Sequence, residues 1–240
     1  MDNMRQKMMY KRGNDGMNSF EMERPAPYHM QFYEQLKQMI FDGQFQPGER
    51  INETQLAKQF GVSRSPVREA MRLLEKDELL IADPKSGYSV YTLTERDVEE
   101  LYQVRMALET LAVKLACKEA TDREIDDIGQ VLTKADEAIK QQLPSQDIVQ
   151  LHEAFHQTII QASHNHRLSK QLNHVNALIH YCRIFHFSGG PRAETIQKEH
   201  TAIFTLIKER RAAEAVQAMT DHLIHDVAHL KQVLSETTEK

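Results

Sequence analysis

The most informative pattern in this 240-residue chain spans residues 52–91, which read NETQLAKQFGVSRSPVREAMRLLEKDELLIADPKSGYSVY. Residues 54–60 predict a short helix, with Asn52 and Gln55 placed as a capping pair at its start. Gly61 would end it because glycine readily adopts the left-handed conformation that follows many helices. A second helix is predicted over 66–76, with Ser65 as its N-cap and a proline in its first turn. The pattern therefore predicts two helices joined by a tight turn.

Basic side chains recur every four residues on one face of the second predicted helix, while an apolar stripe begins at Val67. A charged row alone is also typical of the solvated face of an ordinary helical hairpin. The glycine corner, the Ser-Arg-Ser-Pro cap and the hairpin that follows favour a helix-turn-helix whose second helix enters the DNA major groove. The row consists of Arg64, Arg68, Arg72 and Lys76.

Two strand-like segments, 79–82 and 88–91, follow the second helix and flank a turn that contains Pro, Ser and Gly. They resemble the wing of a winged helix, and a helix predicted over 28–42 would complete that domain. DNA contacts are expected from the helix-turn-helix and from the wing. The expected residues are Arg50, Thr54, Ser63, Arg64, Ser65, Arg68, Arg72, Lys85, Ser86 and Gly87.

The charge balance excludes a protein that binds nucleic acid through bulk basicity. The formal net charge is −5, and residues 25–91 hold eight Lys and Arg against nine Asp and Glu. DNA affinity must therefore come from the placement of charges, chiefly the arginine row. With only two cysteines and no signal peptide or long apolar run, the chain is expected in the reducing cytoplasm and not in a membrane.

The hydrophobic pattern divides the chain into three regions. Residues 1–24 show no period and predict a disordered tail, 25–92 hold the winged helix, and 93–235 read as helices throughout. The expected fold is mainly α, with a winged helix-turn-helix and small β-hairpin wing followed by an all-α bundle that encloses a cavity. The bundle helices are predicted at about 94–119, 121–139, 147–163, 168–187, 192–209 and 212–234.

Capping boxes at Thr94 and Thr121 predict the starts of the first two bundle helices, and Gly189 and Gly190 mark a break before the fifth. The first of these helices should bury one apolar stripe in the bundle. That predicted stripe is Val98, Leu101, Val104, Leu108, Leu111 and Leu115.

The segment GVSRSPVREAMRLLEKDELL, residues 61–80, together with the wing and the all-helical second half, resembles the GntR family of bacterial transcription regulators. The second half is similar to the FadR-type FCD ligand-binding domain, and the likeness covers about residues 28–235. The resemblance implies a homodimer that binds palindromic operator DNA and responds to a small carboxylate effector. One departure is Glu78, where the family usually has glycine just before the wing.

Residues 152–156, His-Glu-Ala-Phe-His, match the H-E-x-x-H motif of zinc peptidases, in which two histidines bind the metal and the glutamate is the base. The downstream Gly and His of the metzincin signature are missing after it. The FCD resemblance implies a different site, built from one carboxylate and three histidines. Carried over by position, these ligands are His152 in place of the usual Asp, His156, His200 and His222.

A nitrogen-rich set of this kind favours zinc, with nickel as a second candidate. The same histidines are also compatible with hydrogen-bonded core residues that bind no metal. A carboxylate effector completing the metal coordination would also pair with a guanidinium, and Arg105 and Arg183 are the candidates. Arg105 is equally well placed to pair with Glu109, one helical turn on.

Taken together, these patterns predict a DNA-binding transcriptional regulator, most simply a repressor, controlled by a small acid at a metal site, and not an enzyme. A zinc-dependent hydrolase built on residues 152–156 is one alternative. A DNA-binding protein whose helical half only dimerises, without metal or effector, is the other.

Overall fold

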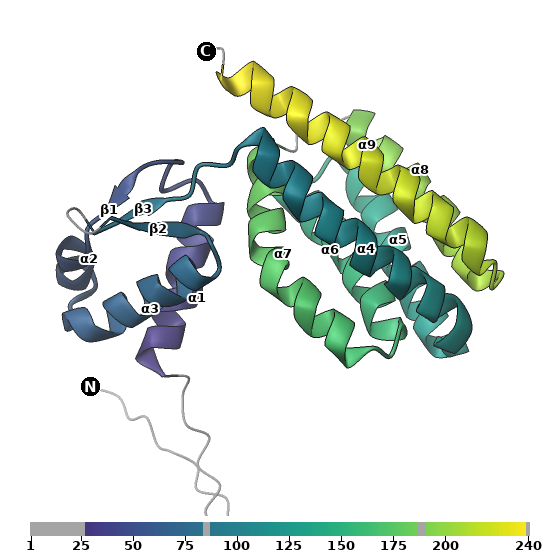
Figure 1. The fold of residues 1–240 in the computed structure, drawn as a ribbon, viewed down its shortest axis with the longest axis horizontal. Coiled ribbons are helices and arrows are strands. Elements are labelled where there is room, and N and C mark those ends of the chain that lie inside the picture. Colours follow the sequence, from purple (N-terminus) through teal and green to yellow (C-terminus); the bar gives the residue numbers. More distant parts are fainter. Residues whose placement is uncertain (1–26, 84–86, 187–190, 239–240) are drawn as a thin grey trace, which may run out of the picture.

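The computed structural model describes residues 27–83, 87–186 and 191–238, and within these ranges the fold is mainly α, as predicted (Figure 1). The first body holds α1 (Tyr28–Phe41), β1 (Arg50–Ile51), α2 (Glu53–Phe60), α3 (Arg64–Lys76), β2 (Leu80–Asp83) and β3 (Gly87–Val90). The second body holds α4 (Glu95–Glu119), α5 (Asp122–Lys140), α6 (Ser145–Ala162), α7 (His166–His186), α8 (Pro191–Lys208) and α9 (Ala212–Thr238). The predicted tail 1–24 and the break at Gly189 lie outside the described residues.

The helix-turn-helix forms through the predicted local signals, with one correction. The Asn52 side chain accepts hydrogen bonds from the first turn of α2, and Gly61 ends that helix at a φ of 66°. The prediction that Ser65 caps the second helix is wrong, because α3 already begins at Arg64 with Ser63 as its N-cap. Proline fits this earlier start because N–H groups throughout the first turn have no helical partner, so Pro66 forfeits no bond.

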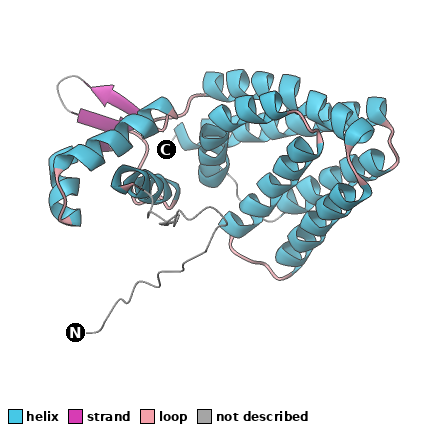
Figure 2. Cartoon of the chain, turned by 90° about the horizontal axis from the view of Figure 1, so that it is seen from below, coloured by secondary structure: helices cyan, strands magenta, loops and turns pink. Residues whose placement is uncertain are grey.

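The wing is an antiparallel three-stranded sheet in the order β1-β3-β2. Its register pairs Leu80 with Val90 and Ile51 with Tyr88. Glu78, which precedes the wing, has a left-handed φ of 59°, a conformation that glycine adopts without strain. The wing-tip residues Lys85 and Ser86 lie outside the described residues, whereas Gly87 is exposed and begins β3. In Figure 2 the strands lie at the end of the molecule away from the bundle.

The bundle is organised around α4 and α9, which lie side by side along its length (Figure 1). Complete capping boxes at Thr94 and Thr121 start α4 and α5, as predicted. The predicted apolar stripe of α4 is wrong in part, since Val104 and Leu111 are 45% and 41% exposed. None of the described helices combines the length and apolar character needed to cross a membrane.

The winged helix contacts the bundle chiefly through α7. The ring of His180 packs edge-on against Phe41 of α1, with ring centroids 4.4 Å apart. The next residue, Tyr181, donates a hydrogen bond of 2.8 Å to the backbone carbonyl of Tyr91, in the segment that joins the wing to α4. The two bodies are therefore joined by side-chain contacts as well as by the connecting chain.

Candidate functional site

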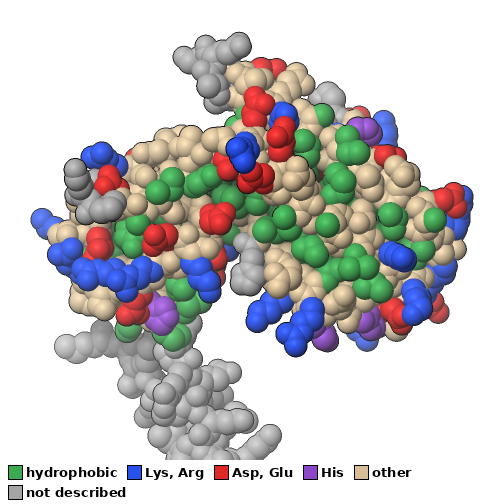
Figure 3. Space-filling model, viewed as in Figure 1, with side chains coloured by type: hydrophobic (Ala, Val, Ile, Leu, Met, Phe, Trp, Pro, Cys, Tyr) green, Lys and Arg blue, Asp and Glu red, His purple; other side chains and the backbone are tan. Residues whose placement is uncertain are grey.

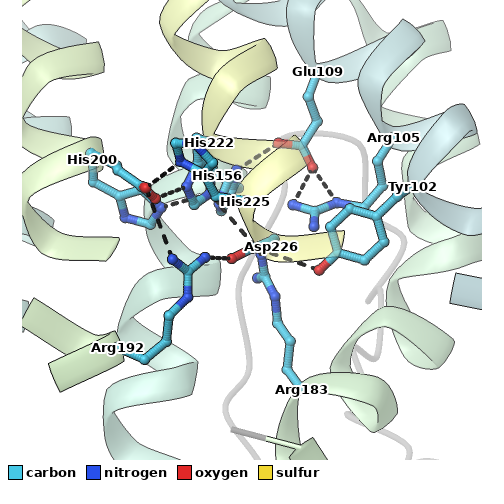
Figure 4. A network of polar contacts seen from close by, with 11 residues as sticks. Tyr102, Arg105, Glu109, His156, Arg183, Arg192, His200, His222, His225 and Asp226 are labelled. Carbon is cyan, nitrogen blue, oxygen red and sulfur yellow. Dashed lines mark hydrogen bonds and ion pairs between the residues drawn. The ribbon is translucent and has the colours of Figure 1, made fainter. Parts of the chain in front are cut away.

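Three buried histidines from three different helices meet inside the bundle (Figure 4). His156 comes from α6, His200 from α8 and His222 from α9, and each side chain is at most 4% exposed. The Nε2 atom of His222 lies 3.2 Å from Nε2 of His200 and 3.3 Å from Nε2 of His156. One ring nitrogen from each residue thus lies within 4.8 Å of the other two, as in a metal site.

Two carboxylates fix the orientation of these rings. Nδ1 of His156 lies 2.5 Å from Oε2 of Glu109, and Nδ1 of His222 lies 2.8 Å from Oε2 of Glu199. Because a carboxylate accepts, each Nδ1 carries the proton and each Nε2 presents a lone pair. The two Nε2 atoms then face one another as acceptors 3.3 Å apart, an arrangement that a cation between them would stabilise.

Burial favours the neutral form of His156 and His200, which is the form that binds metal. Burial lowers the pKa of His156 to about 4, and it holds the pKa of His200 well below the ordinary value. Burial alone would raise the pKa of Glu109, but Arg105 and His156 lower it, so the net pKa lies well below normal. His156 is therefore a neutral nitrogen donor with the ionised carboxylate of Glu109 behind it.

The two nitrogen–nitrogen distances from His222, 3.2 Å to His200 and 3.3 Å to His156, are compatible with a zinc site. In a tetrahedral site with Zn–N distances of about 2.0–2.1 Å, two ligand nitrogens lie about 3.3–3.4 Å apart. His152, the fourth expected ligand, is buried beside the cluster with its ring centroid 5.3 Å from that of His200, but it is not one of the three converging residues. The described residues thus offer three close donors, and a tetrahedral metal bound to them would have one position for another ligand.

Beside the histidines lies a buried ion-pair network centred on Asp226, one turn after His222 on α9. Its Oδ2 atom accepts a hydrogen bond of 3.1 Å from Arg183, and its Oδ1 atom accepts one from Arg192 (Figure 4). Burial alone would raise the pKa of Asp226. His222, Arg183 and Arg192 lower it by more, so the net pKa lies well below the ordinary value and the carboxyl stays ionised. Sequence reasoning missed Asp226, Glu199 and Arg192, although the i, i+4 spacing of Asp226 from His222 was a usable signal.

Both expected effector arginines are buried at this centre. Arg105 is 2% exposed and pairs with Glu109 at 2.6 Å, so the ion pair considered as an alternative does form. Arg183 is 9% exposed and pairs with Asp226. The two guanidinium groups line a cavity of about 70 Å³ together with Glu153 and His156.

On the winged helix, the expected DNA-contacting residues that the structure describes are all exposed. The exposed residues in and next to α3 are Ser63, Arg64, Ser65, Arg68 and Arg72. Arg50 of β1 and Thr54 of α2 are exposed as well. Glu53 of α2 lies 2.8 Å from Arg68 and 3.6 Å from Arg64 and holds both on this surface. Figure 3 shows Lys and Arg side chains gathered on this end of the molecule.

The geometry does not favour a zinc peptidase at residues 152–156. In such an enzyme both motif histidines bind one ion, whereas only His156 belongs to the converging cluster. Glu153, the would-be base, accepts a hydrogen bond of 2.6 Å from Nδ1 of His180. The motif is therefore divided between the histidine cluster and the wall of the neighbouring cavity.

Comparisons with known proteins give a consistent result. Residues 29–90 match the family described as bacterial regulatory proteins, gntR family, and residues 100–225 match the FCD domain. The chain is 50% identical over 223 residues to the HTH-type transcriptional regulator YdhC of Bacillus subtilis, covering 93% of this chain and 100% of the relative.

A second relative is the Nta operon transcriptional regulator of Aminobacter aminovorans, 32% identical over 79% of this chain and 87% of that protein. Among solved structures, E. coli McbR/YncC superposes with a TM-score of 0.72 at 20% identity, covering 87% of this chain and 99% of that one. That structural likeness supports the fold.

Proposed function

This chain belongs to the GntR family of transcription regulators and carries a C-terminal FCD domain, and from that premise we propose that it is a cytoplasmic, homodimeric repressor controlled by a small carboxylate. The proposal that an acid controls the protein is supported by three buried histidine nitrogens that converge beside two buried arginines. The proposed ligands of a zinc ion, or alternatively of nickel, are His156, His200 and His222. His152 lies beside these three residues and is the weakest candidate ligand. The metal would supply a positive centre for an anionic ligand.

The DNA-binding role can be tested on the face of α3. Arg64→Ala and Arg68→Ala are each expected to weaken specific binding by about 1–3 kcal/mol, because arginines in the major groove read base edges. The measurement is the dissociation constant of the full-length protein for an operator selected from random DNA, at fixed salt concentration.

Arg96→Ala provides a matched control for these variants. Arg96 is an exposed arginine on α4, outside the helix-turn-helix, and it pairs with Glu100 at 2.7 Å. Its loss should leave operator affinity within experimental error of the wild type. If both α3 variants also bind as the wild type does, the assignment of α3 as the recognition helix is wrong.

The proposed dimer has a candidate surface on the outward face of α4. Val104 and Leu111 are exposed there, and Leu108 lies between them in a shallow groove beside Val175 of α7. A two-fold dimer needs a self-complementary patch, and an apolar stripe along one helix can pack against its own copy. We propose that a second copy of this chain covers this face, so that two winged helices reach two half-sites.

Leu111→Glu is expected to raise the dimer dissociation constant by at least tenfold, since it places a charge in an apolar contact. Because Leu111 is exposed, the monomer should stay folded. Sedimentation velocity over a concentration series measures this constant. The control is Ile224→Glu, which alters a residue that is 49% exposed on α9. Dissociation in the control alone would place the interface on α9.

The two alternatives predict different results. A helical half that only dimerises would contain no metal and bind no acid. A hydrolase would lose activity on Glu153→Gln and in the presence of a chelator. Metal analysis and native mass spectrometry of the purified protein separate the sensing repressor from the purely dimerising protein.

A further inference from the structure

Two residues that line the cavity of about 70 Å³ beside the histidine cluster each have a buried polar atom without a described partner, one a donor and the other an acceptor. Nη1 of Arg105 and Oε1 of Glu153 are both shielded from solvent, and neither has a hydrogen-bond partner among the residues that the structure describes. One atom is a donor and the other an acceptor. Such atoms are uncommon in folded proteins because an unpaired buried polar group is destabilising.

The remaining polar atoms of these two side chains are already committed. Nε and Nη2 of Arg105 lie 2.7 Å and 2.6 Å from Oε1 of Glu109, and the guanidinium is 2% exposed. Oε2 of Glu153 accepts from Nδ1 of His180 at 2.6 Å. Each side chain is therefore held in place from behind while its last atom remains open to a partner from the cavity.

From these contacts we infer the class of the effector: a small acid that carries a hydrogen-bond donor close to its carboxylate, as 2-hydroxy acids and 2-amino acids do. This inference rests on the proposed sensing function. The carboxylate accepts from Nη1 of Arg105, with Arg183 on the same cavity wall, and the hydroxyl or ammonium group donates to Oε1 of Glu153. A plain carboxylic acid satisfies the arginine and leaves the glutamate oxygen unpaired.

The size of the cavity limits the ligand. One water needs about 10–15 Å³ of such space, so 70 Å³ accommodates roughly five to seven non-hydrogen atoms. Lactate and alanine each have six such atoms, and propionate has the same carbon skeleton without the donor. These three compounds form a matched set in which only the donor changes.

The test is calorimetric titration of the full-length, zinc-loaded protein with two matched sets that fit the cavity: acetate, glycolate and glycine; propionate, lactate and alanine. In at least one set, a donor-bearing acid should bind at least tenfold more tightly than the plain acid. A preference for the hydroxy acid or for the amino acid identifies which donor Glu153 accepts.

Two variants test the role of Glu153 directly. Glu153→Met keeps the length of the side chain and removes the acceptor. The ratio of affinities between the donor-bearing acid and the plain acid should therefore fall below threefold, while the affinity for the plain acid is retained. His180→Ala keeps the acceptor Oε1 but removes the contact that orients it, so the preference for the donor-bearing acid should fall less than in Glu153→Met. Melting curves of both variants confirm that they are folded.

The outcomes separate this inference from the proposed function. If plain acids bind as tightly as their donor-bearing counterparts in every set, or if the preference survives in Glu153→Met, the inference is wrong and acid sensing stands. If no acid binds in any set, the sensing function fails and this inference fails with it, whereas operator binding is unaffected.

Discussion

Replacing His200 with alanine is expected to remove nearly all bound zinc and to lower the melting temperature of the metal-loaded protein by about 8–16 °C. His200 contributes one of three converging nitrogens, and two histidines alone hold zinc weakly. A ligand at 1,000 times its dissociation constant stabilises the folded state by about 4 kcal/mol, and 1 kcal/mol corresponds to about 2–4 °C in a chain of this size. Metal content by mass spectrometry and calorimetric melting measure both effects.

A control variant shows whether the lower melting temperature of His200→Ala comes from lost metal or from lost packing. His166→Ala changes an exposed histidine at the start of α7 and should retain full metal content. Added zinc should raise the melting temperature of the wild type and of the His166 variant, but not that of the His200 variant. His152→Asp, which restores the residue usual in the family, should keep the site. Unchanged metal content in both His200→Ala and His222→Ala would mean that any metal binds elsewhere.

Asp226→Ala is expected to reduce the free energy of unfolding by about 3–5 kcal/mol. The carboxylate accepts from Arg183 and Arg192, whose side chains are only 10% and 13% exposed. Removing one partner of a buried ion pair leaves the other charges uncompensated, which costs far more than the loss of an exposed pair. Denaturant unfolding of chelator-treated protein measures this effect without a contribution from metal.

The control for this change is Asp221→Ala, on the same helix but exposed and bonded to Gln217 at 2.8 Å. It should alter stability by no more than about 0.5 kcal/mol. Asp226→Asn keeps the shape of the side chain and removes its charge, so it should also be strongly destabilising. A cost for Asp226→Ala no larger than that of the control would show that the network contributes little to folding.

The sequence predicted the helix-turn-helix well because its signals are local. Asn52 and Gly61 act through the backbone of their own turn, and the structure shows both where the pattern indicated. The start of α3 was misjudged because proline is tolerated throughout the first turn, so its position does not identify one N-cap residue.

The bundle was harder to predict in detail because hydrophobic periodicity does not distinguish a core from an exposed apolar face. Val104 and Leu111 repeat at helical spacing, yet the face of α4 that enters the bundle carries Arg105 and Glu109. Buried charges of this kind depend on partners from distant helices. Glu109 and its neighbour His156 are 47 residues apart in the chain, and no local pattern relates them.

The contact between α7 and the winged helix bears on how such regulators can be recombined. The sequence suggests that the domains could be exchanged at the segment after Tyr91. A chimera cut there would keep the Tyr91 carbonyl, since it belongs to the backbone, but Phe41 would meet whatever residue the donor bundle has in place of His180. The exchangeable unit is therefore the winged helix plus the 180–181 surface of α7, and engineered sensors should carry both across the junction.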